Sequence, residues 1–168
     1  LWQADEKYVS AYASRFPGYY LTSDGGYKDE DGYIFIMGRM DDVINIAGHR
    51  LSTGAMEEVL ATHPDVAECA VIGTHDELKG EKPVGLIVLK AGVNRDEGEI
   101  KEELQAMVRD QIGPIACYRE TAVVKRLPKT RSGKIMRRIL RKIASNEVDQ
   151  LGDTTTLADP SVVDTLVD

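Results

Sequence analysis

The chain has few residues that form disulfides or bind metals: its 168 residues include two cysteines, Cys69 and Cys117, and three histidines. The two cysteines lack metal-type spacing, so the composition argues against a disulfide-stapled secreted domain and fits a reducing, intracellular compartment. Long apolar runs are also missing, and no segment therefore predicts a membrane span. Because the first residue is Leu1 rather than methionine, we expect the sequence to be part of a longer protein.

Acidic residues are missing from residues 121–146, although the whole chain has a net charge of −7. That stretch holds nine Lys and Arg residues, which leaves 12 basic residues against 28 acidic ones elsewhere. An acidic protein repels the backbone of nucleic acids at long range, so we expect no nucleic-acid partner. A single basic block suits a small anion better, such as the phosphate of a nucleotide or cofactor.

Apolar residues at helical spacing predict three helices. One begins at a cap formed by Ser52 or Thr53 and runs to about residue 62. A second begins at its cap Asp96 and ends at Gly113. The basic residues 135–143 form a third, amphipathic segment, which is expected to pack or dock rather than to lie on a membrane.

Short β-branched runs between breaker residues predict the strands. They are expected at residues 19–22, 33–37, 43–46, 66–72, 83–89 and 121–125. Pro83 suggests that its strand lies at an edge, and the tail after residue 143 is expected to be a loop. The order of elements predicts an α+β fold, a small two-layer sandwich in which helices cover one sheet of a few strands.

The most informative segment is residues 127–134, Leu-Pro-Lys-Thr-Arg-Ser-Gly-Lys, with Ile-Met-Arg-Arg after it. Its Ser-Gly step is flexible, so the ammonium of Lys134 can swing toward a phosphate or carboxylate. A phosphate-binding P-loop is excluded, because that motif needs glycine at Pro128 and Ser or Thr at Ile135. A solvated basic loop ahead of a surface helix is the alternative for these residues.

The full string resembles the motif that ends the adenylate-forming acyl-CoA synthetases, particularly the short-chain branch for acetate and propionate. The resemblance extends from about residue 19 to residue 160. It implies a two-step ligation, in which a short carboxylate and MgATP give acyl-AMP and pyrophosphate, and coenzyme A (CoA) then displaces AMP. In that family the lysine at the position of Lys134 is needed for adenylation, where its charge stabilises the transition state.

The resemblance also implies the domain organisation and the partners. Residues 1–40 would be the short β tail of a large ATP-binding N-terminal domain, and residues 41–168 a mobile C-terminal domain. The implied partners are that N-terminal domain, the carboxylate, ATP with Mg²⁺, CoA, and a lysine acetyltransferase and sirtuin-type deacetylase acting on Lys134. The expected compartment is the cytoplasm, with the mitochondrial matrix as the alternative, and the chain alone is expected to be inactive.

The same resemblance assigns nucleotide-binding residues. It implies that Asp24 binds the ribose of ATP or AMP, although Ser23 stands where the family has glycine. Arg39 and Arg50 would bind the nucleotide, and Asp41 would be the hinge about which the small domain rotates. Judged by themselves, Asp24 fits a turn residue and the two arginines fit surface ion pairs.

Residues for CoA and for a cation follow in the same way. The resemblance implies that Ala47 and Gly48 line the tunnel for the pantetheine arm, and that Arg109 meets the 3′-phosphate end of CoA. Arg109 could equally be an ordinary helix-surface residue. A cation held partly by backbone carbonyls is the weakest expectation; its residues would be Ala61, His63 and Val66.

Two other functions stay open from the sequence alone. The chain could be a CoA-binding or regulatory module without turnover, or part of an adenylating ligase that passes the acyl group to a different thiol. The choice between acetate and propionate cannot be read from these residues, because the acyl pocket is expected in the N-terminal domain.

Overall fold

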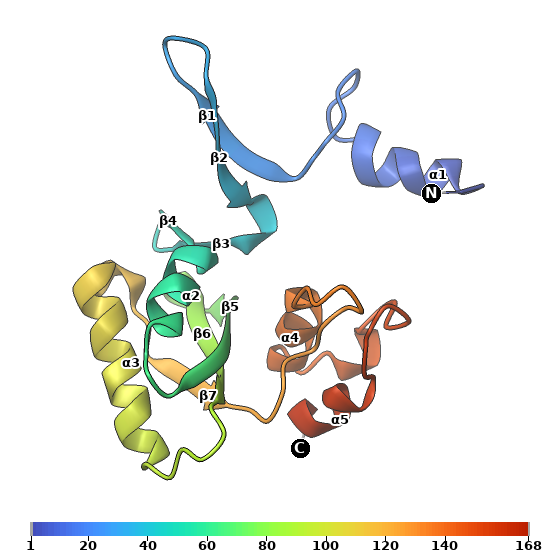
Figure 1. Ribbon diagram of the computed structural model, residues 1–168. Coiled ribbons are helices and arrows are strands. Elements are labelled where there is room, and N and C mark those ends of the chain that lie inside the picture. Colours follow the sequence, from blue (N-terminus) through green and yellow to red (C-terminus); the bar gives the residue numbers. More distant parts are fainter. Residues whose placement is uncertain (1, 168) are drawn as a thin grey trace. The chain divides into compact units, whose positions relative to one another are not determined.

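The computed structural model describes residues 2–167, with all of their side chains except those of Met37 and Asp41. The chain divides into two compact units, Leu1–Asp41 and Asp42–Asp168 (Figure 1). The division falls one residue after the boundary expected between residues 40 and 41. No helix within residues 2–167 is both long enough and apolar enough to cross a membrane.

The first unit contains a short helical segment and a β-hairpin. Helix α1 (Asp5–Tyr8) continues into a π-helical turn, Val9–Ala13, and strands β1 (Asp24–Lys28) and β2 (Ile34–Arg39) pair antiparallel. The acidic turn between them is closed by Asp29, whose carboxylate accepts the Tyr33 N–H at 2.8 Å. Among the described side chains of this unit none is buried.

The strand expected at residues 19–22 is wrong, since β1 begins only at Asp24. Residues 19–22 pack on the π-helical turn instead. The ring of Tyr20 stacks on that of Tyr12 at a centroid distance of 5.1 Å, and the Leu21 N–H donates to the Tyr12 carbonyl at 2.8 Å. These contacts with a helical turn replace a partner strand. The strand expected at residues 33–37 is confirmed as β2.

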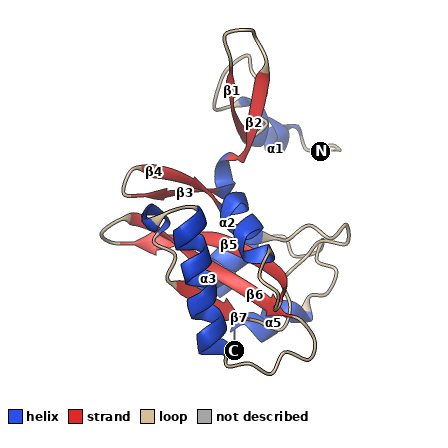
Figure 2. Cartoon of the chain, turned by 60° about the vertical axis from the view of Figure 1, so that its left-hand side comes forward, coloured by secondary structure: helices blue, strands red, loops and turns tan. Residues whose placement is uncertain are grey.

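The second unit contains a five-stranded sheet (Figure 2). Strands β3 (Val43–Ile46), β4 (His49–Ser52), β5 (Val66–Asp76) and β6 (Gly80–Leu89) are antiparallel in the order β4-β3-β6-β5, and β7 (Glu120–Val123) pairs parallel with β6. The edge position expected for Pro83 is wrong, because β6 is central. Proline is tolerated there because β3 pairs with β6 only at Gly80, and β7 pairs with β6 only from Val84 onward.

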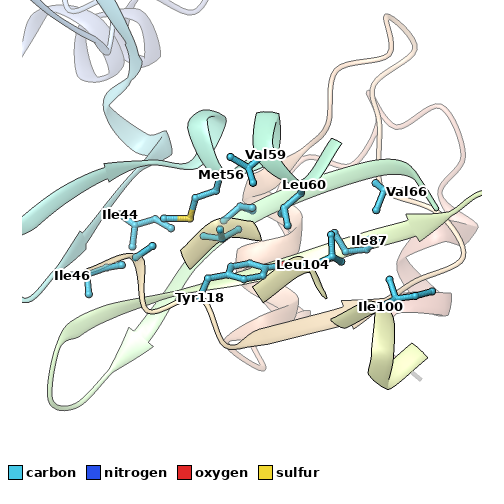
Figure 3. Packing of buried hydrophobic residues seen from close by; sticks show 13 residues of the cluster. Ile44, Ile46, Met56, Val59, Leu60, Val66, Ile87, Ile100, Leu104 and Tyr118 are labelled. Carbon is cyan, nitrogen blue, oxygen red and sulfur yellow. The ribbon is translucent and has the colours of Figure 1, made fainter. Parts of the chain in front are cut away.

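Helices cover both faces of this sheet. Helices α2 (Thr53–Ala61) and α3 (Glu97–Gln111) pack on one face, and α4 (Arg137–Ala144) packs on the other. Figure 3 shows the larger core between the sheet and the first two helices. Neighbouring residues of β5 alternate between the two cores, with Val71 in one and Ala70 and Ile72 in the other. The predicted α+β class with a helix-covered sheet is confirmed.

The expected helix caps are also confirmed. The Ser52 hydroxyl accepts the Ala55 N–H at 3.4 Å, and the Asp96 carboxylate accepts the Glu99 N–H at 3.1 Å. The loop expected after residue 143 is wrong at its end, where α5 (Ser161–Val167) forms. Its Val162 is buried and its Leu166 packs on the smaller core, so burial stabilises a helix that the acidic sequence does not suggest.

Candidate functional site

Lys134 lies at the end of a tight, hydrogen-bonded hairpin. The Thr130 N–H donates to the Lys134 carbonyl at 2.8 Å, and the Lys134 N–H donates to the Thr130 hydroxyl oxygen at 3.1 Å. Gly133 completes the turn with a φ of 83°, a left-handed conformation that glycine adopts without strain. The backbone around Lys134 is therefore held, while its side chain is exposed.

Three cations that lie close to Lys134 in the sequence are engaged in ion pairs. The pairs are Arg126–Asp159 at 2.6 Å, Lys129–Glu68 at 2.5 Å and Arg137–Glu57 at 2.6 Å. Within residues 2–167 no ion pair involves the Lys134 ammonium. Its charge is thus available to an external anion, whereas its neighbours stabilise the fold around it.

Ala47 and Gly48 form the two-residue turn between β3 and β4. Their φ angles are 50° and 88°, as a type I′ hairpin turn requires, and the Ala47 N–H donates to the Lys79 carbonyl at 2.8 Å. A Cβ on Gly48 would meet no atom within 4 Å. Strand β4 was not expected from the sequence, because alanine does not signal a left-handed turn residue. Ala47 and Gly48, which were predicted to line the pantetheine tunnel, thus lie at the exposed end of the β3–β4 hairpin.

Arg50 lies two residues after this turn, on β4, opposite Asn45 of β3. Its side chain is exposed. The β3–β4 turn and the segment around residue 130, drawn in orange, lie well apart in the second unit (Figure 1). The structure therefore brings Arg50 close to Ala47 and Gly48 but does not bring these residues together with Lys134.

Asp24 and Arg39 are brought together in the first unit. They are register partners on β1 and β2, and both adjoin Thr22: the Asp24 N–H donates to its hydroxyl oxygen and Arg39 Nη1 to its carbonyl. Ser23 has a φ of 64°, so it takes the conformation for which the family's glycine is suited. A cavity of about 360 Å³ lies beside them, lined by Arg15, Leu21, Ser23, Arg39 and Met40.

Arg109 lies in the last turn of α3 and lines a cavity of about 490 Å³. Gly113, Cys117 and Arg119 line the same cavity. The Gln105 side chain donates to the Arg119 carbonyl at 2.9 Å and so links this loop to α3. Arg119 was not among the residues expected to bind CoA. The only sequence signal for it was an arginine shortly after Gly113-Pro114, where the helix ends. The guanidinium groups of Arg109 and Arg119 line the same cavity, and such groups suit a phosphate.

Both ring nitrogens of His63 have hydrogen-bond partners within the protein. His63 is buried, its Nε2 lies 2.8 Å from Glu103 Oε2, and its Nδ1 accepts the Asp65 N–H at 3.2 Å. Since Nδ1 accepts, Nε2 carries the proton and donates to Glu103. The cation expected at Ala61, His63 and Val66, held partly by backbone carbonyls, stays a prediction. The His63 carbonyl accepts the Val66 N–H at 3.2 Å. No group of three His, Cys, Asp or Glu within residues 2–167 could hold a metal ion.

Cys69 lies on β5 against the larger core. Burial raises the pKa of its thiol to about 11, with a further contribution from the Glu57 carboxylate. The thiol therefore stays protonated at neutral pH and is a core group rather than a nucleophile.

Comparison with known proteins identifies the domain. Residues 55–134 match the family model described as the AMP-binding enzyme C-terminal domain. The chain carries an AMP-binding enzyme C-terminal domain. The matched stretch begins in α2 and ends at Lys134 itself, so the tail beyond Lys134 lies outside it.

The similarity to known proteins covers the whole chain or nearly all of it. The chain is 51% identical to the acetyl-coenzyme A synthetase of Penicillium chrysogenum, over 100% of this chain and 25% of that protein. It is 52% identical to the acetyl-coenzyme A synthetase of Saccharophagus degradans, over 97% of this chain and 25% of that protein. The chain thus spans about a quarter of the length of the curated relatives it matches.

Solved structures show the same fold. An acyl-CoA synthetase of Brucella canis is 38% identical, with a TM-score of 0.59, over 80% of this chain and 24% of that one. The amide bond synthetase McbA of Marinactinospora thermotolerans is 30% identical, with a TM-score of 0.64, over 84% of this chain and 28% of that one. The fold of this chain therefore occurs both in a protein named as an acyl-CoA synthetase and in one named as an amide bond synthetase.

Proposed function

We propose that this chain is the C-terminal part of an AMP-forming acyl-CoA synthetase for a short carboxylate, acetate or propionate. In the first half-reaction the carboxylate attacks the α-phosphorus of ATP, and pyrophosphate leaves. In the second, the CoA thiol attacks the acyl carbon, and AMP leaves. The supporting observation is the exposed Lys134 on a hydrogen-bonded hairpin, whose ammonium forms no ion pair within residues 2–167, in a chain 51% identical to an acetyl-coenzyme A synthetase.

Lys134 would act in the first half-reaction. Negative charge collects between the carboxylate and the α-phosphate as the new bond forms, and a fixed ammonium stabilises that charge more than it stabilises the bound substrates. A well-placed donor of this kind contributes about 3–4 kcal/mol, or a factor of about 10²–10³ in rate. The exposed side chain can reach into a site formed largely by other parts of the protein.

The other predicted residues would bind the substrates. Asp24 would accept hydrogen bonds from the ribose hydroxyls, and Arg39 and Arg50 would neutralise phosphate charge of ATP, which binds with Mg²⁺. The turn at Ala47 and Gly48 would pass close to the pantetheine arm, since its backbone tip carries little side-chain bulk. Arg109 would meet a CoA phosphate from its cavity at the end of α3.

The first unit would belong to the large N-terminal domain of the longer protein. Its aromatic and aliphatic side chains support this assignment, because Tyr19, Tyr33, Ile34 and Ile36 are 65–77% exposed. So many apolar side chains without a buried core need cover from another part of the protein. The relatives are about four times as long as this chain, which leaves room for such a part.

Both half-reactions would use the same active site in turn. Lys134 and the turn at Ala47 and Gly48 come from separate loops of the second unit and cannot fill one position at once. We propose that the second unit rotates about Asp41 between the two half-reactions. Asp41 is the last residue of the first unit, so a rotation there would leave both units intact.

The test compares the full-length protein with its Lys134→Ala variant. Acetate- or propionate-dependent pyrophosphate release measures adenylation, and thioester formation from supplied acyl-AMP and CoA measures the second half-reaction. We expect adenylation to fall by about 10²–10³-fold while thioester formation is kept. The control Lys125→Ala removes an exposed charge from the same basic block and should change neither rate.

Other outcomes assign other functions. Equal loss of both half-reactions, or of neither, would contradict the proposed role of Lys134. Adenylation without transfer to CoA would indicate a ligase with a different acceptor. CoA binding without either half-reaction in the full-length protein would indicate a regulatory module.

A further inference from the structure

The C-terminal tail pairs with the outer edge of the Lys134 hairpin. On its inner side, residues 128–130 pair with residues 134–136 through the Thr130 N–H to Lys134 and the Met136 N–H to Pro128. On its outer side, the Arg131 N–H donates to the Thr156 carbonyl at 3.3 Å, and the Ala158 N–H donates to the Lys129 carbonyl at 2.9 Å. The segment before the turn is therefore central, not an edge.

Thr130 is the residue that joins the two sides. It is the antiparallel partner of Leu157 in the tail. Its N–H and hydroxyl oxygen both bond to the backbone of Lys134, and its carbonyl accepts the Gly133 N–H at 2.9 Å. Any displacement of Thr130 would thus move the backbone from which the Lys134 side chain extends.

The tail is anchored on both sides of its pairing segment. Before it, the Arg138 guanidinium donates to the Leu151 carbonyl and, at 2.7 Å, to the Asp153 carbonyl. After it, Asp159 pairs with Arg126 at 2.6 Å. Leu157 itself is only 3% exposed. These contacts hold residues 156–158 against the hairpin independently of the two bonds between the strands.

We propose that tail residues 156–158 position Lys134 for adenylation by pairing with the hairpin through Thr130. This rests on the proposed function of Lys134. A two-stranded hairpin by itself is only marginally stable in water. A third strand supplies hydrogen bonds to the outer backbone groups and reduces the range of positions open to the lysine, which a reaction sensitive to geometry requires.

The first experiment measures the hairpin without reference to activity. In the full-length protein, Leu157→Ala should speed amide hydrogen exchange at Thr130 and Gly133 by about tenfold or more. Leu157→Met, which keeps the buried apolar bulk, should restore slow exchange. The matched control is Val162→Ala in α5, a tail residue that is 4% exposed and makes none of the hairpin contacts described above. Unchanged exchange in Leu157→Ala would overturn the proposal.

The second experiment measures the two half-reactions of the same variants. Leu157→Ala should slow adenylation by about tenfold and keep thioester formation, while Leu157→Met and Val162→Ala keep both. Equal loss of both rates would indicate a merely structural tail and overturn the proposal, as would faster exchange with unchanged adenylation. If Lys134→Ala itself left adenylation intact, the proposed function would fail, and the exchange result would still decide whether the tail orders the hairpin.

Discussion

Arg137 donates to both carboxylate oxygens of Glu57, with Nε 3.0 Å from Oε1 and Nη2 2.6 Å from Oε2. Glu57 Oε1 also accepts the Val71 N–H at 2.8 Å. One carboxylate thus joins α2, β5 and the first residue of α4. Because Arg137 follows Lys134 by three residues, this bidentate pair fixes the end of the lysine hairpin to the core.

Removal of the Glu57 carboxylate should destabilise the protein. The Arg137 guanidinium, which is only 24% exposed, loses its bidentate partner in Glu57→Ala. The Val71 N–H loses its acceptor in the same variant. Because the guanidinium keeps some contact with water whereas Val71 is fully buried, we expect a loss of about 1–3 kcal/mol in the free energy of unfolding. Urea unfolding measures it. The control Lys101→Ala, which breaks an exposed pair with Glu97, should cost less than about 0.5 kcal/mol.

Glu103 should make stability depend on pH in the acid range. A hydrogen bond from Arg95, and to a smaller extent one from His63, lowers the pKa of its carboxyl to about 2. A lowered pKa contributes stability that is complete above the unfolded-state value, about 4.3, and that is lost as the pH falls toward 2. Glu103→Gln should therefore be less stable than the wild type at pH 7, and the difference should shrink between pH 4.5 and pH 2.

Urea unfolding at several pH values tests this expectation. The exposed neighbour Glu102 supplies the control, since Glu102→Gln should follow the wild-type pH dependence. A constant difference between Glu103→Gln and the wild type from pH 7 to pH 2.5 would contradict the argument.

Gly85 and Gly54 should respond to alanine in opposite directions. A Cβ on Gly85 would lie 1.9 Å from the hydroxyl oxygen of Tyr118, whose buried ring packs over β6. Gly85→Ala should cost about 1–3 kcal/mol through overpacking. Gly54 lies in α2, where the nearest atom to an added Cβ is 3.4 Å away, so alanine should stabilise the helix by up to about 1 kcal/mol.

Thermal unfolding of the two alanine variants distinguishes these effects. Gly85→Ala combined with Tyr118→Leu should recover part of the loss, because the shorter side chain leaves room for the new methyl group. If Gly85→Ala were as stable as the wild type, the close packing of Tyr118 on this strand would be wrong.

The sequence predicted those features of the fold that depend on residues close together along the chain. The caps Ser52 and Asp96 were found because a side-chain acceptor and its N–H donors lie within three residues. Strand β4 was missed because its turn depends on a left-handed Ala47, which no propensity signals. The strand misplaced at residues 19–22 has strand-like composition but packs on a helical turn that is not obvious from sequence.

The supports of the candidate site could not be predicted for a different reason. The motif itself indicated Lys134, since its residues are contiguous. Glu57 and Arg137 are 80 residues apart, and Thr130 and Leu157 meet only because the tail returns to the hairpin. Each contact also uses residues that are common on protein surfaces. Spacing along the chain carries no information about such pairs, so they require the fold.

Restriction of the backbone at Asp41 should impair the change between half-reactions. Asp41→Pro fixes φ at this residue and restricts Met40 before it, so the second unit could not adopt both orientations. We expect at least one half-reaction of the full-length protein to slow by about tenfold or more. Asp41→Ala removes the carboxylate but keeps φ free, and should stay near the wild-type rates. Full rates for both half-reactions in Asp41→Pro would show that the hinge lies elsewhere.

Acetylation of Lys134 should stop adenylation with little effect on the fold. The acetyl group removes the positive charge, and the ammonium makes no ion pair within residues 2–167 that its loss would break. In full-length protein acetylated only at this position, we expect pyrophosphate release to fall about as far as in Lys134→Ala, with thioester formation from acyl-AMP and the melting temperature unchanged. Incubation with a sirtuin-type deacetylase should restore the rate.

The matched control is acetylation at Lys125, which neutralises one charge of the same basic block. If the effect of Lys134 acetylation came from the total charge of the block, both modified proteins would lose adenylation to a similar extent. If it comes from a single ammonium at the reacting phosphate, only the protein modified at Lys134 loses it. Unchanged adenylation after complete acetylation at Lys134 would refute the electrostatic role, because no charge would remain there to stabilise the transition state.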